Sequence, residues 1–181
     1  LADVSPKALQ HAREQVQQRG LADRAQLVCA DGLNALTEKT GCVSITGMGG
    51  RTMADILQKG AARLQGAALV LSAHTDQELV RRAVQQLGYH LTAERLCRAA
   101  GRFYLVWKAI PGAQTMGEDE LALGTQLLLE SRDPLLPEYL RWRQWVLERK
   151  LAGLEHDAQK RAGEVEALRR QLGILRRNDA C

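Results

Sequence analysis

The sequence is poor in several residue types, and each shortage narrows what the protein can be. Aromatic residues make up 4% of the chain, with a single phenylalanine. The cysteines form no C-x-x-C pair and have no spacing typical of a metal site, which argues against a disulfide scaffold and a zinc module. They are Cys29, Cys42, Cys97 and Cys181. Because Cys29 and Cys42 lie in apolar runs, we expect them to be buried, reduced thiols.

Long hydrophobic runs are also absent. No apolar stretch approaches the roughly 18 residues that a membrane span needs, and no signal peptide opens the chain, so we expect a cytoplasmic protein with no membrane partner. Nor is there a large excess of either charge, since the formal net charge is +4. A mildly basic protein can bind a polyanion. Basic residues are concentrated in 81–108, where six Lys or Arg accompany one acid, and in 137–181, where ten accompany seven.

What the sequence does contain is a glycine cluster after a β-branched run. Residues 43–46 read Val-Ser-Ile-Thr, and glycines follow at positions 47, 49 and 50. An amphipathic segment then begins at Thr52, so the pattern predicts a strand, a tight turn and a helix. In α/β proteins this arrangement lies at the carboxyl edge of a parallel sheet, where ligands bind. The glycines either let a ligand approach the backbone or serve only the geometry of the turn, and the pattern leaves both open.

The rest of the first 112 residues alternates between short apolar runs and amphipathic segments. This alternation predicts strands at 26–30, 42–46, 67–72, 89–96 and 102–109, and helices at 6–20, 33–36, 52–64 and 76–87. The last two strands meet near Gly101 as a hairpin. The order predicts a three-layer α/β sandwich, mostly parallel, with an antiparallel edge. Residues 1–4 resemble the end of a strand, so we expect a preceding piece, missing from this sequence, with at least one strand and one helix.

The composition changes after residues 111–112. We expect a helix at 118–130 that Pro134 and Pro137 separate from a later leucine stripe. From Leu151 onward apolar residues recur at alternating spacings of three and four, so the stripe must be buried against another helix. We favour two antiparallel helices with a break near 153–157 over one long helix. The chain thus divides into a first domain at 1–112 and a helical coiled-coil domain at 113–181, with Trp142 and Trp145 expected to pack between them.

Acidic residues follow two consecutive strands. Asp3 ends the first visible strand, and Asp31 ends the next one. Counting the strand expected in the missing piece, these are the second and third strands of the fold. In nucleotide-binding α/β folds an acid at the end of the second strand accepts hydrogen bonds from a ribose diol. An acid after the next strand can accept a hydrogen bond from an adenine amino group. Together with the glycine cluster, the two acids indicate a nucleoside-containing ligand, and they do not separate S-adenosylmethionine from NAD.

Several sequence blocks, in this order, resemble one family. They are Asp3-Val4-Ser5-Pro6 with Leu9, Ala30-Asp31-Gly32-Leu33, Ile45-Thr46-Gly47-Met48-Gly49-Gly50, Gly88-Tyr89 and Gly101-Arg102-Phe103-Tyr104. They resemble the bacterial tRNA (adenine-N1)-methyltransferases of the TrmK type, which act on adenine 22 in the D loop. The resemblance spans nearly the whole chain. Two features depart from it: the family's first glycine-containing block, Asp-Ile-Gly-Thr-Asp-His, is absent, and Ser72-Ala73-His74 stands where the family usually has Gln-Pro-Asn.

The resemblance implies a Rossmann-like class I methyltransferase sandwich followed by a C-terminal helical coiled-coil domain. It implies S-adenosylmethionine as the cofactor and tRNA as the partner, with no metal, and we expect a monomer. Asp3 would hold the ribose of the cofactor. The residues that would face the cofactor's adenine are Asp31, Gly32 and Leu33, and those that would form the target-base pocket are Gly47, Met48, Gly49 and Gly50, with Gly47 also beside the cofactor.

The resemblance leaves the catalytic residue open, because the best candidate for a general base would lie in the absent block. Candidate contacts to the substrate RNA are His74, Arg95, Arg98, Arg102 and Arg141. Two alternatives come from other classes. One is an NAD-dependent oxidoreductase, since Asp3 would serve the ribose of NAD equally well. The other is a non-catalytic RNA-binding or assembly module, in which the α/β part is a scaffold and the helices dock a partner.

Overall fold

The computed structural model describes residues 1–154, 159 and 161–178, and its elements follow the predicted order. The helix expected at 52–64 is divided at Gly60 into two. In chain order the elements are β1 (Ala2–Asp3), α1 (Pro6–Gln18), η1 (Ala22–Arg24), β2 (Val28–Cys29), η2 (Gly32–Ala35), β3 (Cys42–Met48), α2 (Gly50–Lys59), α3 (Ala61–Leu64), β4 (Ala68–Ala73), α4 (Gln77–Gln86), β5 (Tyr89–Ala99), β6 (Arg102–Pro111), α5 (Glu118–Leu123), α6 (Gln126–Leu129), α7 (Leu136–Leu154) and α8 (Ala162–Asn178).

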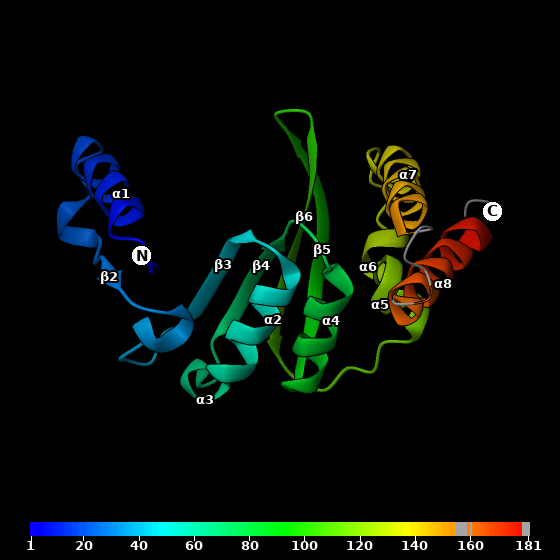
Figure 1. Ribbon diagram of the computed structural model, residues 1–181. Helices are drawn as coiled ribbons and strands as arrows, with labels where there is room; N and C mark the ends of the chain where they lie inside the picture. Colours follow the sequence, from blue (N-terminus) through cyan, green and yellow to red (C-terminus); the bar gives the residue numbers. More distant parts are fainter. Residues whose placement is uncertain (155–158, 160, 179–181) are drawn as a thin grey trace.

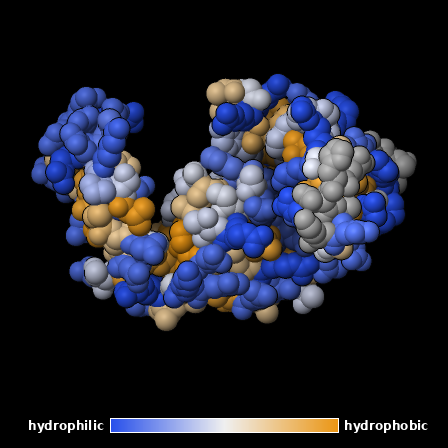
Figure 2. Space-filling view, in the orientation of Figure 1, coloured by the Kyte–Doolittle hydropathy of each residue, from blue (hydrophilic) through white to orange (hydrophobic). Residues whose placement is uncertain are grey.

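The N-terminal unit consists of β1, α1 and β2. The Ser5 hydroxyl caps α1 by accepting a hydrogen bond from the Ala8 backbone N–H at 3.3 Å, and Pro6 occupies the first turn. β1 and β2 pair in parallel, with Asp3 opposite Cys29. Among the described residues this ladder is not hydrogen-bonded to the main sheet. The unit stands apart at the blue end of the chain (Figure 1), and an open cleft separates it from the body of the molecule (Figure 2).

The main sheet is mixed, with strand order β3-β4-β6-β5. β3 and β4 are parallel, whereas β6 is antiparallel to both β4 and β5. The expectation of a mostly parallel sheet is therefore wrong for this part of the described chain. The reason is that the returning strand of the hairpin inserts beside β4, so it contributes an antiparallel pairing on each of its edges.

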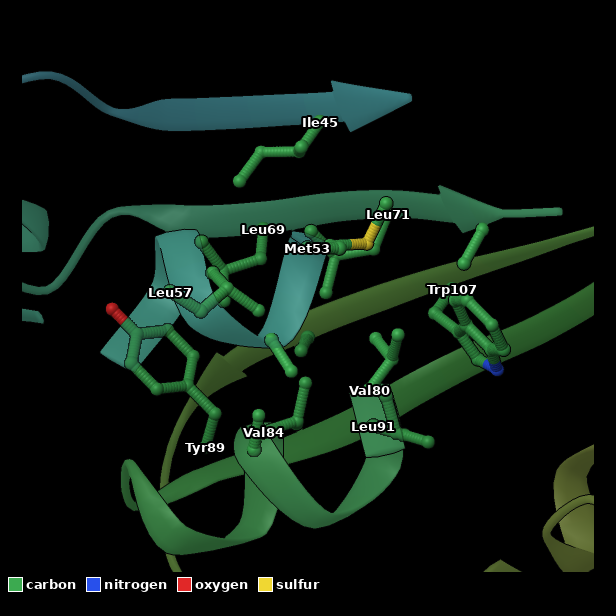
Figure 3. Close-up of a cluster of buried hydrophobic side chains, with 14 of the residues drawn as sticks. Ile45, Met53, Leu57, Leu69, Leu71, Val80, Val84, Tyr89, Leu91 and Trp107 are labelled. Carbon is green, nitrogen blue, oxygen red and sulfur yellow. The ribbon is translucent and has the colours of Figure 1, made fainter. Parts of the chain in front are cut away.

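Helices α2 and α4 cover one face of the main sheet (Figure 1). Burying a large apolar side chain stabilises the fold by about 1.5–3 kcal/mol, so this layer supplies much of the driving force for folding. The side chains that meet there, each at most 1% exposed, are Met53, Leu57, Leu69, Leu71, Val80, Val84 and Trp107 (Figure 3).

The expectation that Cys29 and Cys42 are buried is wrong, because both are exposed, as is Cys97. In β3 the side chains alternate between buried and exposed, and Cys42 begins the exposed set while Val43 begins the buried one. Alternation across a strand therefore decides the environment of this thiol, not the apolar character of its neighbours. Cys181 lies outside the described residues.

The helix expected at 118–130 is interrupted, and α5 and α6 take its place. Between them Gly124 has a φ of 146°, outside the helical region. Thr125 then donates hydrogen bonds from its backbone N–H and from its hydroxyl to one carboxylate oxygen of Glu94, both at 2.7 Å. A buried acceptor thus satisfies a backbone donor that a continuous helix would have satisfied internally.

Helices α7 and α8 pack against each other along a leucine-rich side, as the stripe in the sequence predicts. Arg176 near the end of α8 forms an ion pair with Glu148 of α7 at 3.1 Å. α7 ends at Leu154, within the segment where we expect the break, and residues 155–157 lie outside the described residues. The buried residues shared by the pair include Leu147, Leu154, Val165, Leu168, Leu172 and Leu175.

A buried ion pair connects the sheet to this helical part. The side chains of Arg81 on α4 and Glu94 on β5 are both 0% exposed. Glu94 accepts hydrogen bonds from Arg81 Nη2 at 2.6 Å and from Trp107 Nε1 at 2.7 Å, besides the two from Thr125. Arg81 also donates to the Leu121 carbonyl oxygen of α5 at 2.9 Å. Burial alone would raise the pKa of the Glu94 carboxyl, but the Arg81 charge and these hydrogen bonds outweigh it and hold that pKa below its usual value.

Candidate functional site

The glycine cluster forms the turn between β3 and α2, at the carboxyl edge of the parallel pair β3–β4. The pairing of the two strands shifts register between Thr46 and Met48, and Gly47 has a φ of 80°, a conformation that favours glycine. A Cβ placed on Gly47 would meet nothing within 4 Å. Gly47 therefore presents its backbone to open space at the sheet edge.

Gly50 has the opposite surroundings. A Cβ there would lie 2.4 Å from the backbone carbonyl oxygens of both Thr75 and Asp76. The Gly50 N–H donates to the Thr75 carbonyl at 2.9 Å, and the His74 N–H donates to the Met48 carbonyl at 3.0 Å. The turn after β3 and the turn after β4 are thus held together by their backbones, and Gly50 is required for that approach.

Aromatic contacts join the β5–β6 hairpin to the turn after β4 and, through a separate group of rings, to α7. The rings of His74 and Tyr104 meet edge to face, with centroids 5.8 Å apart. Phe103 packs against Tyr139 and Trp142 of α7, with centroid distances of 5.7 and 5.6 Å. Trp142 thus packs between the helices and the sheet as expected. Sequence reasoning places His74 at this edge and misses the contact with Tyr104, although the Gly-Arg-Phe-Tyr block is the signal that could have found it.

Of the two acids singled out in the sequence, Asp3 ends β1 and Asp31 lies between β2 and η2, and both are exposed. One carboxylate oxygen of Asp3, Oδ1, accepts a hydrogen bond from the Ser5 N–H at 2.7 Å, which orients the group. Asp31 precedes η2, and its side chain makes no capping hydrogen bond there. β1 contacts η2, and η2 contacts α2, so the two acids are linked to each other and then to the helix that the glycine cluster begins.

Gly32 and Leu33 attach this region to α2. Gly32 has a φ of 53°, and a Cβ there would lie 3.1 Å from the Ile56 side chain. Leu33 is 5% exposed and belongs to the main core. The structure therefore gives Leu33 a packing role, and its backbone is the part that can border a ligand beside Asp31.

The candidate RNA-contacting arginines differ in whether their side chains already form ion pairs or hydrogen bonds within the protein. Arg98 forms an ion pair with Glu138 at 2.8 Å and lies 5.4 Å above the Phe103 ring, so it helps to dock α7 onto the hairpin. Arg95 donates to the Glu94 carbonyl oxygen and lines a cavity of about 450 Å³ near α5 and α6. Arg102 at the hairpin turn and Arg141 on α7 are exposed and have no ion-pair partner among the described residues.

Within the part of the chain that the structure describes, no group of three or more His, Cys, Asp or Glu could hold a metal ion. None of the described helices combines the length and the apolar character of a membrane span.

Comparison with known proteins gives a consistent set of similarities. A family model described as tRNA (adenine(22)-N(1))-methyltransferase matches residues 1–173. Among solved structures, a candidate tRNA (m1A22) methyltransferase of Streptococcus pneumoniae has 25% identity and a TM-score of 0.81, over 98% of this chain and 80% of that one.

Two other solved structures show the same fold at lower identity. TrmK of B. subtilis, an M1A22 tRNA methyltransferase, has 19% identity and a TM-score of 0.78, over 98% of this chain and 80% of that one. TrmK of M. capricolum, in complex with S-adenosyl-homocysteine, has 17% identity and a TM-score of 0.71, over 96% of this chain and 80% of that one. No curated protein matches the sequence.

Proposed function

The chain belongs to the family of tRNA (adenine(22)-N(1))-methyltransferases, which use S-adenosylmethionine to methylate N1 of an adenine in tRNA, and from this premise we propose how its residues hold the two substrates. The fold is Rossmann-like. Family membership sets aside the NAD-dependent oxidoreductase and the non-catalytic module. The cofactor site lies across the cleft between the N-terminal unit and the turn after β3, and the target adenine lies at that turn.

The residues on the cofactor side of the cleft fit a nucleoside. The Asp3 carboxylate is exposed, and within the described residues its second oxygen has no hydrogen-bond partner, so it can accept bonds from two ribose hydroxyls. Asp31, with the backbone of Gly32 and Leu33, borders the adenine. Gly47 lets the cofactor approach its backbone, because no side chain intervenes. When bound, S-adenosylmethionine supplies an electrophilic sulfonium methyl group.

The target-base pocket consists of residues 47–50 with His74 and Tyr104 beside them. Adenine N1 carries a lone pair, so the protein mainly has to position the base and exclude water. The tied turns after β3 and β4 give a rigid floor for this purpose. Exposing a stacked or paired base costs a few kcal/mol, and contacts elsewhere on the tRNA offset that cost. We assign no general base among the described residues.

The chain is organised as a methyltransferase domain at 1–112 and a helical domain at 113–181, in which α7 and α8 form a short coiled coil. The buried leucines shared by the two helices and the ion pair between them support this. We propose that the protein acts as a monomer in the cytoplasm, where its tRNA substrate is found. Light scattering behind a sizing column tests the monomer, since a mass near twice 20.0 kDa would contradict it.

The family match over residues 1–173 is the observation that carries the function. The experiment is to incubate the protein with S-adenosylmethionine and unmodified tRNA, and then to read the RNA by reverse transcription. Methylation at N1 blocks Watson–Crick pairing, so we expect a new stop at adenine 22. A tRNA with guanine at this position is the matched control. A stop at another adenine would refute the position, and the absence of both a stop and calorimetric cofactor binding would refute the function.

A further inference from the structure

Trp145 is the exposed tryptophan of this protein. It lies on α7 with 53% of its surface exposed, whereas Trp107 is 1% exposed and Trp142 is packed against Phe103. Both Trp142 and Trp145 are expected from the sequence to pack between the domains, and for Trp145 this is wrong. Three residues along a helix turn a side chain by about 60°, enough to take Trp145 off the face that meets the hairpin. Tryptophan is enriched at interfaces, because it combines a large apolar ring with an N–H donor.

Two arginines flank Trp145 on the same face of α7. Arg141 and Arg149 stand one turn before it and one turn after it, and the Arg149 guanidinium lies 5.0 Å from the centroid of the indole ring. Neither arginine has an ion-pair partner among the described residues. We call these three residues the Arg-Trp-Arg stripe. At a rise of about 1.5 Å per residue it spans about 12 Å.

The nearby acids do not neutralise this stripe. Glu138, one turn before Arg141, is occupied by Arg98 at 2.8 Å. Glu148 is occupied by Arg176 of α8 and by Gln144. The stripe therefore presents two positive charges around an aromatic face, which is complementary to a phosphate backbone with an unstacked base.

The stripe also begins beside the proposed target-base pocket. The adjacent face of α7 carries Tyr139 and Trp142, which pack on Phe103. The Tyr139 hydroxyl also donates to the Gln77 side chain at 3.0 Å, at the first residue of α4, directly after the turn of Thr75 and Asp76 that Gly50 meets. A nucleic acid with one base in that pocket can thus continue along α7 and meet the stripe.

We propose that Trp145 stacks on an unpaired base of the substrate tRNA, with Arg141 and Arg149 contacting the phosphates on either side. This rests on the proposed function only in taking tRNA as the ligand. Base–aromatic stacking tolerates any base, so the stripe supplies affinity and holds the loop in place, while the pocket selects the adenine. An apolar protein partner would desolvate the two arginines without pairing their charges, which disfavours such a partner.

The test compares tRNA binding by Trp145→Ala, Trp145→Phe and the unchanged chain. We expect about 5- to 150-fold weaker binding for Trp145→Ala, the range found for loss of one stacked base, and a much smaller loss for Trp145→Phe, which keeps a stacking ring. Acrylamide should quench Trp145 fluorescence in the free protein, and tRNA should protect it. Wild-type affinity in Trp145→Ala would overturn the proposal. If Trp145→Ala changed the sedimentation of the free protein and not its affinity for tRNA, the ring would belong to a contact between copies, and the proposal would also be overturned.

A matched pair of charge variants separates the stripe from general basicity. Arg149→Gln should lower the slope of log affinity against log salt by about 0.7–0.9, as loss of one phosphate contact does. Arg169 of α8 is exposed and unpaired within the described chain, so Arg169→Gln removes the same charge elsewhere and should leave the slope unchanged. Equal effects of the two variants would refute a specific stripe.

Catalysis at saturating tRNA separates this proposal from the proposed function. Trp145→Ala should raise KM for tRNA in proportion to the loss of affinity and leave kcat close to that of the unchanged chain. If the unchanged chain bound tRNA through Trp145 but gave neither a reverse-transcription stop nor calorimetric cofactor binding, the proposed function would fail and the stripe would stand. If Trp145→Ala lowered kcat and left KM unchanged, the stripe would fail and the function would stand.

Discussion

Among the glycines of the site, Gly50 has the least room for a side chain. In Gly50→Ala the new Cβ would lie 2.4 Å from two backbone carbonyl oxygens, so the turns after β3 and β4 must separate. We expect a loss of about 1–3 kcal/mol of unfolding free energy, the usual cost of overpacking. The rate of methyl transfer should fall even under conditions where the variant stays folded, because the turns that shape the pocket have moved. Urea unfolding and initial rates measure the two.

Gly173→Ala is the control for that substitution. The nearest atom to its new Cβ is Arg177 Nη1 at 3.7 Å, an ordinary contact inside α8. Alanine favours a helix interior, so this variant should gain up to about 1 kcal/mol and keep its activity. A Gly50→Ala variant as active as Gly173→Ala would show that the joined turns do not shape the pocket.

Asp3 offers a direct test of the cofactor site. Removing a charged hydrogen-bond acceptor costs about 1.5–3 kcal/mol, so Asp3→Ala should bind S-adenosylmethionine about 10- to 150-fold more weakly in calorimetry. Asp23→Ala, which removes an exposed acid from η1 in the same unit, should bind it normally. Equal binding by the two variants would remove Asp3 from the site.

Glu94 links stability to pH. Its pKa is lowered in the folded protein, so its ionised form contributes stability at pH values above its ordinary pKa of 4.5, and this contribution is lost as pH falls through the lower, folded value. Glu94→Gln should cost about 3–5 kcal/mol, because the Arg81 charge stays buried without its partner. Urea unfolding between pH 7 and pH 3 checks this, since the variant should lose less stability on acidification than the unchanged chain. An equally steep loss would assign the acid sensitivity to other carboxylates.

At the scale of elements, α8 is held onto the sheet domain by charge. Arg170 forms ion pairs with Glu78 of α4 at 2.8 Å and with Glu118 of α5, and Arg82 also pairs with both acids. Burial raises the pKa of the Glu78 carboxyl, and hydrogen bonds from Arg170, Arg82 and Gln171 more than reverse this and lower it. These charges form one network joining α4, α5 and α8.

Arg170→Gln should weaken this network. Because Arg170 is 36% exposed, we expect a loss of about 1 kcal/mol in dilute buffer, shrinking in high salt as the charges are screened. Arg169→Gln, one position earlier and exposed, should have no effect on unfolding. An Arg170→Gln cost that is the same at both salt concentrations would mean that packing, not charge, holds α8 there.

The elements differ in how well the sequence predicts them. The glycine turn, the β5–β6 hairpin and the α7–α8 pair follow from local patterns, because turn residues and apolar periods act over a few positions. The break at Gly124 could not be predicted, since its cause is the acceptor Glu94, which lies 31 positions from Thr125. The same holds for Cys42 and Trp145, whose exposure depends on which face of an element the rest of the chain covers. Of the candidate site, the turn at 47–50 is predictable and its close approach to Thr75 and Asp76 is not.

At the scale of the whole molecule, the N-terminal unit is attached by few contacts. Its β1–β2 ladder is separate from the main sheet among the described residues, and the link runs through η2 to α2. Such a unit opens locally at low free-energy cost, so its amides should exchange with solvent faster than those of β4 and β6. Adding S-adenosylmethionine should slow exchange at 2–3, 28–33 and 47–50 together, as followed by mass spectrometry. Protection confined to 47–50 would place the cofactor away from the cleft.

The hydrogen bonds from Thr125 to Glu94 have a consequence for how the chain unfolds. The proposed domain boundary near residue 112 is not a boundary in stability, because atoms from both sides of it complete one buried cluster. Heating should therefore give a single calorimetric transition whose van 't Hoff and calorimetric enthalpies agree, although the chain reads as two domains. A protein divided at residue 112 would leave Glu94 and Arg81 without the partners that Thr125 and Leu121 supply, so neither half should recover the melting temperature of the whole.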